Sequence, residues 1–247
     1  MNHPKVLVGC PTYEGFGYCL EIFLERIRSL SYPNYDILLV DNSEGDDYLN
    51  RIKEKRVRVI KAPRFKEMFE TVAYSRNMMI DFALDNGFDY LLNLDQDVIP
   101  PKNIIEELIG CNKDIISGLY FGLYKTSTGL KKLPVAYANI TEEEFNKMQK
   151  ICPFPSFIKS CDDIKRNLTD DEIEGERILE VRVPSNGCML IKRNVMEDKD
   201  IRFGMIDLAG RPGKTGDEML FCKKAREKGF RLYVYTKIKC EHLVKKD

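Results

Sequence analysis

Two aspartates one residue apart, Asp95 and Asp97, are the side chains of this sequence whose spacing most directly suggests chemistry. They follow a short apolar run that begins at Tyr90, and two prolines, Pro100 and Pro101, come soon after. This pattern predicts a buried strand that delivers both carboxylates to the rim of a sheet. Mg²⁺ and Mn²⁺ prefer hard oxygen ligands and are commonly held by one or two carboxylates together with substrate phosphates. The pair therefore indicates a site for a divalent cation and a diphosphate.

A second triplet of the same pattern, Asp198-Lys199-Asp200, shows that the spacing alone does not identify a site. It lies in the charged stretch from Glu197 to Arg202, and no apolar run leads into it. We expect Asp198 and Asp200 to lie in a solvated turn. The context of the triplet, and not the triplet itself, separates the two.

Apolar runs alternate with helical periodicity in the first half of the chain. We predict strands over residues 6–10, 35–40, 57–60, 90–95 and 114–121, and helices over 18–30, 46–55, 67–86 and 103–109. This alternation predicts an α/β fold with a mostly parallel sheet and helices on both faces. Ligands of such sheets bind beyond the carboxyl ends of the strands. The polar residues at those ends are Thr12–Glu14, Asp41-Asn42 and Asp95–Asp97.

Residues 125–177 interrupt this rhythm with many charges, scattered prolines and no clear period. We interpret them as an insertion or lid over the pocket, in which Thr141 begins a short helix with a capping box. Order returns in strands predicted at 178–183, 187–191 and 231–235, a helix at 216–228 and a tail at 239–243. The prediction is a single domain, 1–247, whose halves 1–124 and 178–247 flank the insertion.

The composition excludes several classes of protein. The chain has 39 basic and 39 acidic residues, which argues against nucleic acid as a partner. No apolar run approaches the roughly 20 residues that span a bilayer, and because residues 1–5 lead directly into a short strand we expect no signal peptide. The eight cysteines include no C-x-x-C pair, which argues against a zinc ribbon. We expect a cytoplasmic protein without a transmembrane segment, for which peripheral contact with a membrane-bound acceptor stays open.

Six short motifs occur in the order that is typical of one family. They are Pro11-Thr12-Tyr13, Val40-Asp41-Asn42-Ser43, Ser75-Arg76-Asn77, Asp95-Gln96-Asp97, Gly216-Asp217-Glu218 with Phe221-Cys222, and His242. With these motifs the chain resembles the GT-A glycosyltransferases, specifically family 2-like enzymes, over residues 5–124 and 180–243. Each motif is weak alone, but six in order are specific for the fold. The resemblance implies a GT-A (Rossmann-like) fold and transfer of a sugar from a nucleoside diphosphate to an acceptor hydroxyl.

The resemblance also implies a donor site that contains Mn²⁺ or Mg²⁺. Asp97 would contact the metal, Asp95 would face the ribose or a metal-bound water, and His242 would be a metal or diphosphate ligand. The metal would act as a Lewis acid that neutralises the leaving nucleoside diphosphate. Asp41 would accept a hydrogen bond from the base and Arg76 would contact phosphate. The remaining residues predicted to line the nucleotide site are Pro11, Thr12, Tyr13, Glu14 and Gln96.

Asp217 and Glu218 open a predicted helix, where the helix dipole favours acidic residues in any case. The resemblance implies that one of them is the general base that deprotonates the acceptor hydroxyl. Relatives commonly carry Glu-Asp at this point, with the second carboxylate as base, whereas this chain has the reversed order. Glu218 is the second carboxylate of the pair in this chain, so its position favours it as the base, and Asp217 is the alternative. In the Gly-rich stretch just before, Lys214 or Arg211 would touch phosphate when that loop closes over the donor.

The sequence is compatible with several hypotheses about the function. A base without an evident nucleophile favours direct displacement with inversion, but the fold does not fix the outcome and a retaining enzyme is an alternative. A nucleotidyltransferase on a similar sheet is a second alternative. Such enzymes have a Gly-rich first loop with Arg and Lys, whereas Cys10–Gly15 of this chain contains neither basic residue. A non-catalytic sugar- or nucleotide-binding protein would lack the carboxylates. The donor sugar is not identified, and the acceptor could be a glycan, a lipid or a small molecule.

Overall fold

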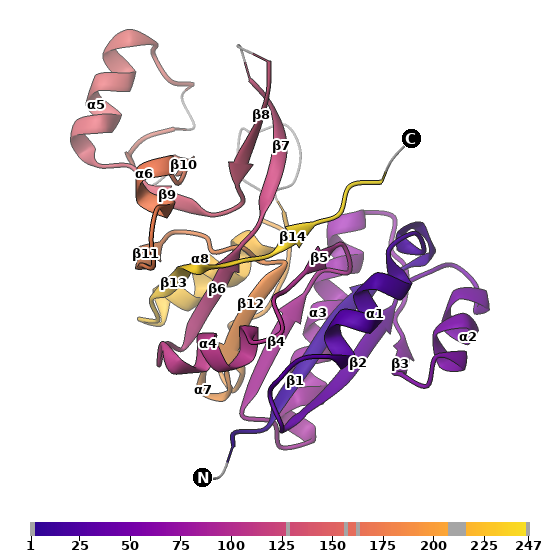
Figure 1. Ribbon diagram of the computed structural model, residues 1–247. Helices are drawn as coiled ribbons and strands as arrows, with labels where there is room; N and C mark the ends of the chain where they lie inside the picture. The colour runs from indigo at the N-terminus through magenta and orange to yellow at the C-terminus, as the bar shows by residue number, and fades with distance from the viewer. Residues whose placement is uncertain (1–2, 127–128, 156–157, 162–163, 207–215, 246–247) are drawn as a thin grey trace.

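The computed structural model describes residues 3–126, 129–155, 158–161, 164–206 and 216–245. Its centre is an eight-stranded sheet in the order β11-β13-β6-β12-β4-β1-β2-β3 (Figure 1). Neighbours from β4 to β3 are parallel, as are β6 and β13, whereas β12 is antiparallel to both of its neighbours and β11 to β13. The prediction of an α/β fold with a mostly parallel sheet is confirmed. The strands are β1 Val6–Thr12, β2 Tyr35–Asp41, β3 Arg58–Lys61, β4 Tyr90–Leu94, β6 Ile115–Leu119, β11 Ile178–Val181, β12 Cys188–Lys192 and β13 Leu232–Lys239.

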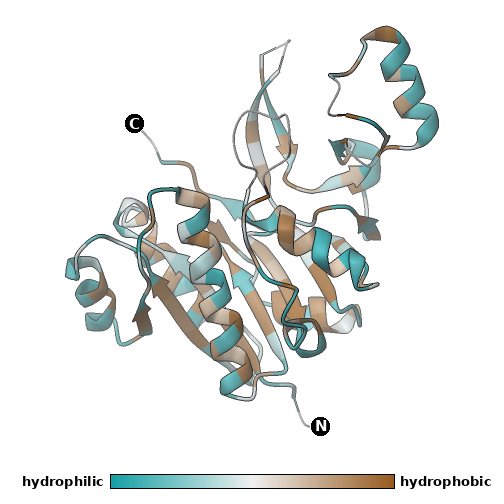
Figure 2. Cartoon of the chain, turned by 180° about the vertical axis from the view of Figure 1, so that it is seen from behind, coloured by the Kyte–Doolittle hydropathy of each residue, from teal (hydrophilic) through white to brown (hydrophobic). Residues whose placement is uncertain are grey.

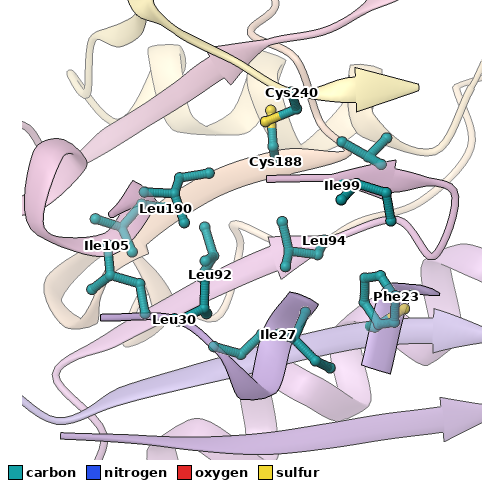
Figure 3. Close-up of a cluster of buried hydrophobic side chains, with 14 of the residues drawn as sticks. Phe23, Ile27, Leu30, Leu92, Leu94, Ile99, Ile105, Cys188, Leu190 and Cys240 are labelled. Atoms are coloured by element: carbon teal, nitrogen blue, oxygen red, sulfur yellow. The ribbon is translucent and has the colours of Figure 1, made fainter. Parts of the chain in front are cut away.

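Helices cover both faces of this sheet (Figure 1). Successive residues of a strand point to opposite faces, so Val6 and Val8 pack in one core cluster and Leu7 in the other. The first cluster, part of which is shown in Figure 3, includes side chains of α1 Leu20–Arg28, α2 Asp47–Glu54 and α4 Ile104–Gly110. The second includes those of α3 Met68–Asp85, α7 Arg193–Met196 and α8 Glu218–Glu227.

Hydropathy follows this layering. The strands of the sheet are largely hydrophobic and the helices carry hydrophilic residues on their outer surfaces (Figure 2). Glycines end two of the helices as predicted, because Gly87 after α3 and Gly229 after α8 have φ of 69° and 86°, a conformation that favours glycine. Within the described residues no helix is long and apolar enough to cross a membrane.

Several predicted boundaries are wrong, including the end of β13, which lies at Lys239 and not at Tyr235. Strand β1 does not stop at Cys10, because Pro11 and Thr12 continue the parallel pairing with β2. The strand predicted over 114–121 breaks at Tyr120 into β6 and β7 Phe121–Thr126, which belong to different sheets. The predicted tail is also a strand: β14 Glu241–His242 pairs antiparallel with β5 Val98–Ile99.

The interruption at 125–177 has regular structure of its own. Strand β7 forms a hairpin with β8 Gly129–Pro134, and this hairpin and α5 Glu142–Ile151 project beyond the sheet (Figure 1). The predicted capping box at Thr141 is confirmed, because its side chain accepts from the backbone N–H of Glu144 and the Glu144 carboxylate accepts from Thr141. The remaining elements are β9 Tyr137–Asn139, β10 Lys165–Asn167 and α6 Asp170–Ile173. Its role as a lid stays a prediction.

Candidate functional site

A cavity of about 1070 Å³ lies beyond the carboxyl ends of β1 and β4, where the sequence predicts a ligand. Most of the predicted site residues line it, although they come from distant parts of the chain. Glu14 and Asp41 are not among the side chains at the cavity wall. The predicted residues that do line it are Pro11, Thr12, Tyr13, Arg76, Asp95, Gln96, Asp97, Asp217, Glu218 and His242.

Asp97 and His242 face each other at one wall of this cavity. Pairing of β14 with β5 sets His242 opposite Val98, and the backbone N–H of Leu243 donates to the Asp97 carbonyl over 2.8 Å. Nε2 of His242 then lies 3.3 Å from Oδ2 of Asp97. This hydrogen bond raises the pKa of His242 above its ordinary value, against the effect of burial. The structure thus brings together two side chains that the sequence separates by 145 positions.

The other ring nitrogen of His242 determines what this pair can hold. Nδ1 lies 3.0 Å from the carbonyl oxygen of Phe121, which only accepts, so Nδ1 carries the proton in the neutral ring. Nε2 and the Asp97 carboxylate are then two acceptors that face each other, and a proton or a cation must lie between them. A histidine whose second nitrogen is held by a carbonyl is the usual arrangement of a metal ligand.

The donor set also fits the expected metals. Within the described part of the chain, no three His, Cys, Asp or Glu side chains are grouped to hold a metal ion. Two protein ligands suit Mg²⁺ or Mn²⁺ bound together with substrate phosphates, since such ions rarely occupy dedicated all-protein cages. One carboxylate and one neutral imidazole are acceptable ligands for Mn²⁺.

Asp95 is ion-paired with Arg76. Its Oδ1 is 2.5 Å from Nη2 of Arg76, and its backbone N–H donates to the carbonyl of Gly187 over 3.0 Å. A Cβ at Gly187 would lie 2.8 Å from Oδ2 of Asp95 and 3.0 Å from the ring of Tyr120, so glycine is what lets the backbone approach the carboxylate. Burial raises the pKa of Asp95, and Arg76 opposes that shift.

Arg76 lines the cavity. It pairs with a carboxylate of the predicted donor site, Asp95, and with one of the two predicted bases, Asp217. It lies in the middle of α3, its side chain is 4% exposed, and its guanidinium is ion-paired with both Asp95 and Asp217. Nε of Arg76 is buried without a hydrogen-bond partner among the described residues. Burial lowers the pKa of Arg76, but the two carboxylates outweigh this effect and keep it above its ordinary value. Arg76 is therefore a charged link beneath the site.

Asp217 and Glu218 differ in their surroundings although they are adjacent. Asp217, just before α8, has a side chain that is 5% exposed and ion-paired with Arg76. Burial raises the pKa of Asp217 to about 6, against the opposing effect of Arg76. Glu218 is the first residue of α8 and is partly buried at the cavity wall, and its side chain has no hydrogen bond or ion pair with another described residue. Its carboxylate is available to a ligand.

Gln96, between the two aspartates, is engaged with the protein. It is 2% exposed, and its Oε1 accepts from the hydroxyl of Thr12. Its Nε2 donates to the carbonyl of Phe16 over 2.8 Å and to the hydroxyl of Tyr48 over 3.1 Å. Because each polar atom of the amide has a protein partner, Gln96 clamps the loop that follows β1 against the Asp95–Asp97 turn.

Asp41 lies beneath the cavity and is completely buried. Its Oδ1 accepts from the backbone N–H and the hydroxyl of Ser43, and its Oδ2 is 2.9 Å from Nζ of Lys61. Ser43 Oγ in turn accepts from the backbone N–H of Glu14 over 2.9 Å. These bonds form an aspartate turn that ties the loop after β2 to the loop after β1. Recognition of a base by Asp41 stays a prediction.

The structure adds Tyr120, which sequence reasoning missed. Tyr120 is buried at the cavity wall, where its ring meets that of His242 edge-on with 5.2 Å between centroids. Asn186 also lines the cavity, and its backbone carbonyl accepts from Nδ2 of Asn93 over 2.5 Å. Tyr120 marks the break between β6 and β7, which the continuous apolar run from 114 hides. Arg211 and Lys214, predicted to touch phosphate, lie outside the described residues.

Two solved structures resemble this chain. TarS of S. aureus (residues 1–349, in complex with UDP-GlcNAc) has a TM-score of 0.54 and 15% sequence identity, over 98% of this chain and 60% of that one. GalNAc-T7 with UDP, GalNAc and Mn²⁺ has a TM-score of 0.61 and 12% identity, over 99% of this chain and 44% of that one. This chain spans less than two thirds of the length of either structure. At such low identity the likeness shows the fold, and it confirms the predicted GT-A architecture.

Sequence comparison identifies the family more directly. No curated protein sequence matches this chain. The family profile described as "Glycosyl transferase family 2" matches residues 8–198. This range includes every cavity-lining residue from Pro11 to Asn186. Since that match covers most of the chain, the protein belongs to glycosyl transferase family 2.

Proposed function

We propose that this protein is a metal-dependent glycosyltransferase that moves a sugar from a nucleoside diphosphate to a hydroxyl of an acceptor. The observation that carries the proposal is the Asp97–His242 pair, whose Oδ2 and Nε2 atoms lie 3.3 Å apart at the wall of a large cavity. Membership of glycosyl transferase family 2 supports the reaction class. TarS and GalNAc-T7 were solved with UDP-GlcNAc and with UDP and Mn²⁺, so a uridine diphosphate sugar is the first donor to test.

Asp97 and His242 would hold the metal, and Mn²⁺ or Mg²⁺ would fit their donor atoms. When bound, the ion supplies Lewis-acid neutralisation of the leaving diphosphate. The Phe121 carbonyl fixes the tautomer that leaves Nε2 of His242 free to coordinate. Asp95 would remain on its ion pair with Arg76 and present its second oxygen towards the ribose or a metal-bound water.

The nucleotide would occupy the part of the cavity lined by the loop after β1. Tyr13 and Phe16 meet edge-on there, with 5.1 Å between ring centroids, and the Arg64 guanidinium lies 5.4 Å from the Tyr13 ring. An aromatic face next to a cation suits a base that stacks beside its phosphates. Pro11 and Thr12 complete this wall. Asp41 and Glu14 would act from below, by fixing the turn that shapes the loop.

Glu218 would be the general base. Its carboxylate faces the cavity without a partner among the described residues, whereas Asp217 is held by Arg76. In the proposed step the acceptor oxygen attacks the anomeric carbon, the bond from that carbon to the diphosphate oxygen breaks, and the hydroxyl proton passes to Glu218. Direct displacement of this kind inverts the anomeric configuration. The acceptor class, whether glycan, lipid or small molecule, is left to the assay.

Arg76 would be a positioning residue and not a phosphate ligand. Its fork is occupied by Asp95 on the donor side and Asp217 on the base side, so it holds the two halves of the site at a fixed separation. Residues 125–177 would act as a lid, because Val135 and Tyr137 of this segment line the same cavity. A lid that excludes water would protect the donor from hydrolysis.

A donor-hydrolysis and transfer assay tests the proposal. The protein is incubated with UDP-sugars and Mn²⁺ or Mg²⁺, with an EDTA-treated sample as control, and release of UDP is measured. We expect metal-dependent UDP release that a suitable acceptor accelerates, and a product whose anomeric configuration, read by NMR, is inverted. UDP release that is equal in EDTA would contradict metal dependence, and retained configuration would contradict direct displacement.

A further inference from the structure

One face of the β7–β8 hairpin is built differently from the rest of the surface. Residues directly opposite each other on paired antiparallel strands share a face, as do residues two apart on one strand. The register pairs Leu123 with Lys132 and Lys125 with Leu130. These four side chains, which we call the Leu-Lys face, therefore alternate apolar and cationic groups on one side of the hairpin.

The Leu-Lys face is open to solvent. Leu123 is 61% exposed and Leu130 is 73% exposed, and both lysines are exposed. Neither lysine has an ion pair with another described residue; Lys132 lies 5.5 Å from the ring of Phe121 at the base of the hairpin. Large apolar side chains that are exposed together on one face and flanked by charged residues are typical of an interaction surface.

Charge on the hairpin is one-sided. The sequence from 121 to 134 contains three lysines and no acidic residue, in a chain whose charges balance overall. The opposite face is already engaged, because the hydroxyl of Tyr124 is 3.0 Å from that of Tyr137. A partner of the Leu-Lys face must therefore combine negative charge with apolar groups that receive leucine side chains. An anionic bilayer surface has both properties.

The hairpin also lies at the mouth of the cavity. Gly122, Leu123 and Tyr124 line it from one side, while exposed Met68 and Phe69 at the start of α3 line it from the other. We propose that the β7–β8 hairpin docks the protein on anionic lipid bilayers, with the leucines of the Leu-Lys face in the interface and its lysines on the headgroups. Docking in this way brings the cavity mouth to the membrane, where an acceptor could be delivered.

Vesicle sedimentation of the full chain, without donor or metal, tests the docking. We expect the protein to pellet with phosphatidylcholine vesicles that contain phosphatidylglycerol and to stay in solution with pure phosphatidylcholine, with binding weakened by salt. Leu130→Ser or the pair Lys125→Gln and Lys132→Gln should each weaken vesicle binding by roughly tenfold or more. Ile151→Ser on α5, where Ile151 is 85% exposed, is the matched control and should bind as the parent does.

Fluorescence gives a second readout, because the sequence contains no tryptophan. In Leu130→Trp the single indole should shift to shorter wavelength on anionic vesicles and be quenched by brominated lipid. In Ile151→Trp neither change should occur. The matched Ile151→Trp variant separates insertion of the hairpin from non-specific adsorption of poorly folded protein.

Several outcomes would overturn the proposal. These are equal binding to neutral and anionic vesicles, binding that Leu130→Ser and Ile151→Ser reduce alike, or an indole at position 130 that stays in water. A concentration-dependent dimer in size exclusion that Leu130→Ser abolishes would assign the face to a second copy of the chain. Because these measurements use no nucleotide or acceptor, they stand or fall separately from the proposed transferase activity.

Discussion

Arg76 is ion-paired with Asp217, although 141 positions separate them in the sequence. The same guanidinium reaches Asp95, so one buried cation joins the carboxylate that follows β4 to the carboxylate that precedes α8. This pairing divides the reversed Asp-Glu pair into two roles. Asp217 neutralises a buried charge, and the neighbouring Glu218 is free at the cavity wall.

The first prediction concerns Glu218. Glu218→Gln keeps the shape of the side chain but cannot accept a proton, so we expect kcat to fall by roughly 10²–10⁴-fold, as is typical for loss of a general base. The KM for donor should change little. Because Glu218 has no described ion pair, stability should stay within about 0.5 kcal/mol of the parent. Steady-state kinetics with a thermal melt measure both effects, and unchanged kcat would exclude Glu218 as the base.

Asp217→Asn, unlike Glu218→Gln, should lower the stability of the fold. It leaves Arg76, with a side chain that is 4% exposed, beside one carboxylate instead of two. Because Asp95 still neutralises Arg76, the expected loss is that of one hydrogen bond between charged groups, about 1.5–3 kcal/mol, and for a chain of this size each kcal/mol lowers Tm by roughly 2–4 °C. Calorimetry of Asp217→Asn and Glu218→Gln side by side makes the comparison. Equal melting temperatures for the two variants would show that the ion pair does not stabilise the fold.

Gln96→Leu tests whether the residue between the aspartates is a clamp. The substitution removes hydrogen bonds to Thr12, Phe16 and Tyr48 and leaves their polar groups buried. We expect a loss of about 1–3 kcal/mol in the free energy of unfolding. Urea denaturation of the unliganded protein measures it. A variant as stable as the parent, with only weakened donor binding, would instead make Gln96 a ligand contact.

A pH dependence should arise at Glu172, which does not line the cavity. Arg166 donates to both of its carboxylate oxygens over 2.7 and 2.9 Å, which lowers the pKa of Glu172 to about 2. A depressed carboxyl pKa stabilises the fold above the unfolded value of roughly 4.3. That stabilisation is lost as the pH falls through the folded pKa.

The stability difference between the parent and Glu172→Gln should therefore be constant from pH 7 to about 5 and shrink as the pH falls from about 4.3 towards 2. Urea denaturation of both proteins at a series of pH values measures it. A difference that persists unchanged at pH 2.5, or grows there, would exclude this linkage.

Much of the fold can be predicted because its strands are short apolar runs with clear ends. The run from Tyr90 predicts both β4 and the position of Asp95, and the alternation of strands with helices predicts the sheet. Polar strand residues are harder to recognise: β13 continues to Lys239 because every second residue is buried, although Thr236, Lys237 and Lys239 are polar or charged. The short elements of 125–177 carry no period long enough to detect.

The site is only partly predictable for a different reason. Sequence identifies the residue types, but the pairings depend on which elements meet in space. Pairing of β14 with β5 joins His242 to Asp97, and the packing of α3 beneath the sheet edge joins Arg76 to Asp217. Neither pairing leaves a local signal. Asp95 and Gln96 were predicted as ligand contacts, and the structure gives each of them protein partners.

The central claim is that Asp97 and His242 hold a divalent cation that UDP shares, and a titration of UDP tests it most directly. Isothermal calorimetry is run with Mn²⁺ and with EDTA on the parent, on Asp97→Asn, and on Asp198→Asn, which alters the other Asp-x-Asp triplet. We predict that Mn²⁺ strengthens UDP binding in the parent and in Asp198→Asn and has no effect in Asp97→Asn. UDP binding to Asp97→Asn that Mn²⁺ strengthens as much as in the parent would contradict the account.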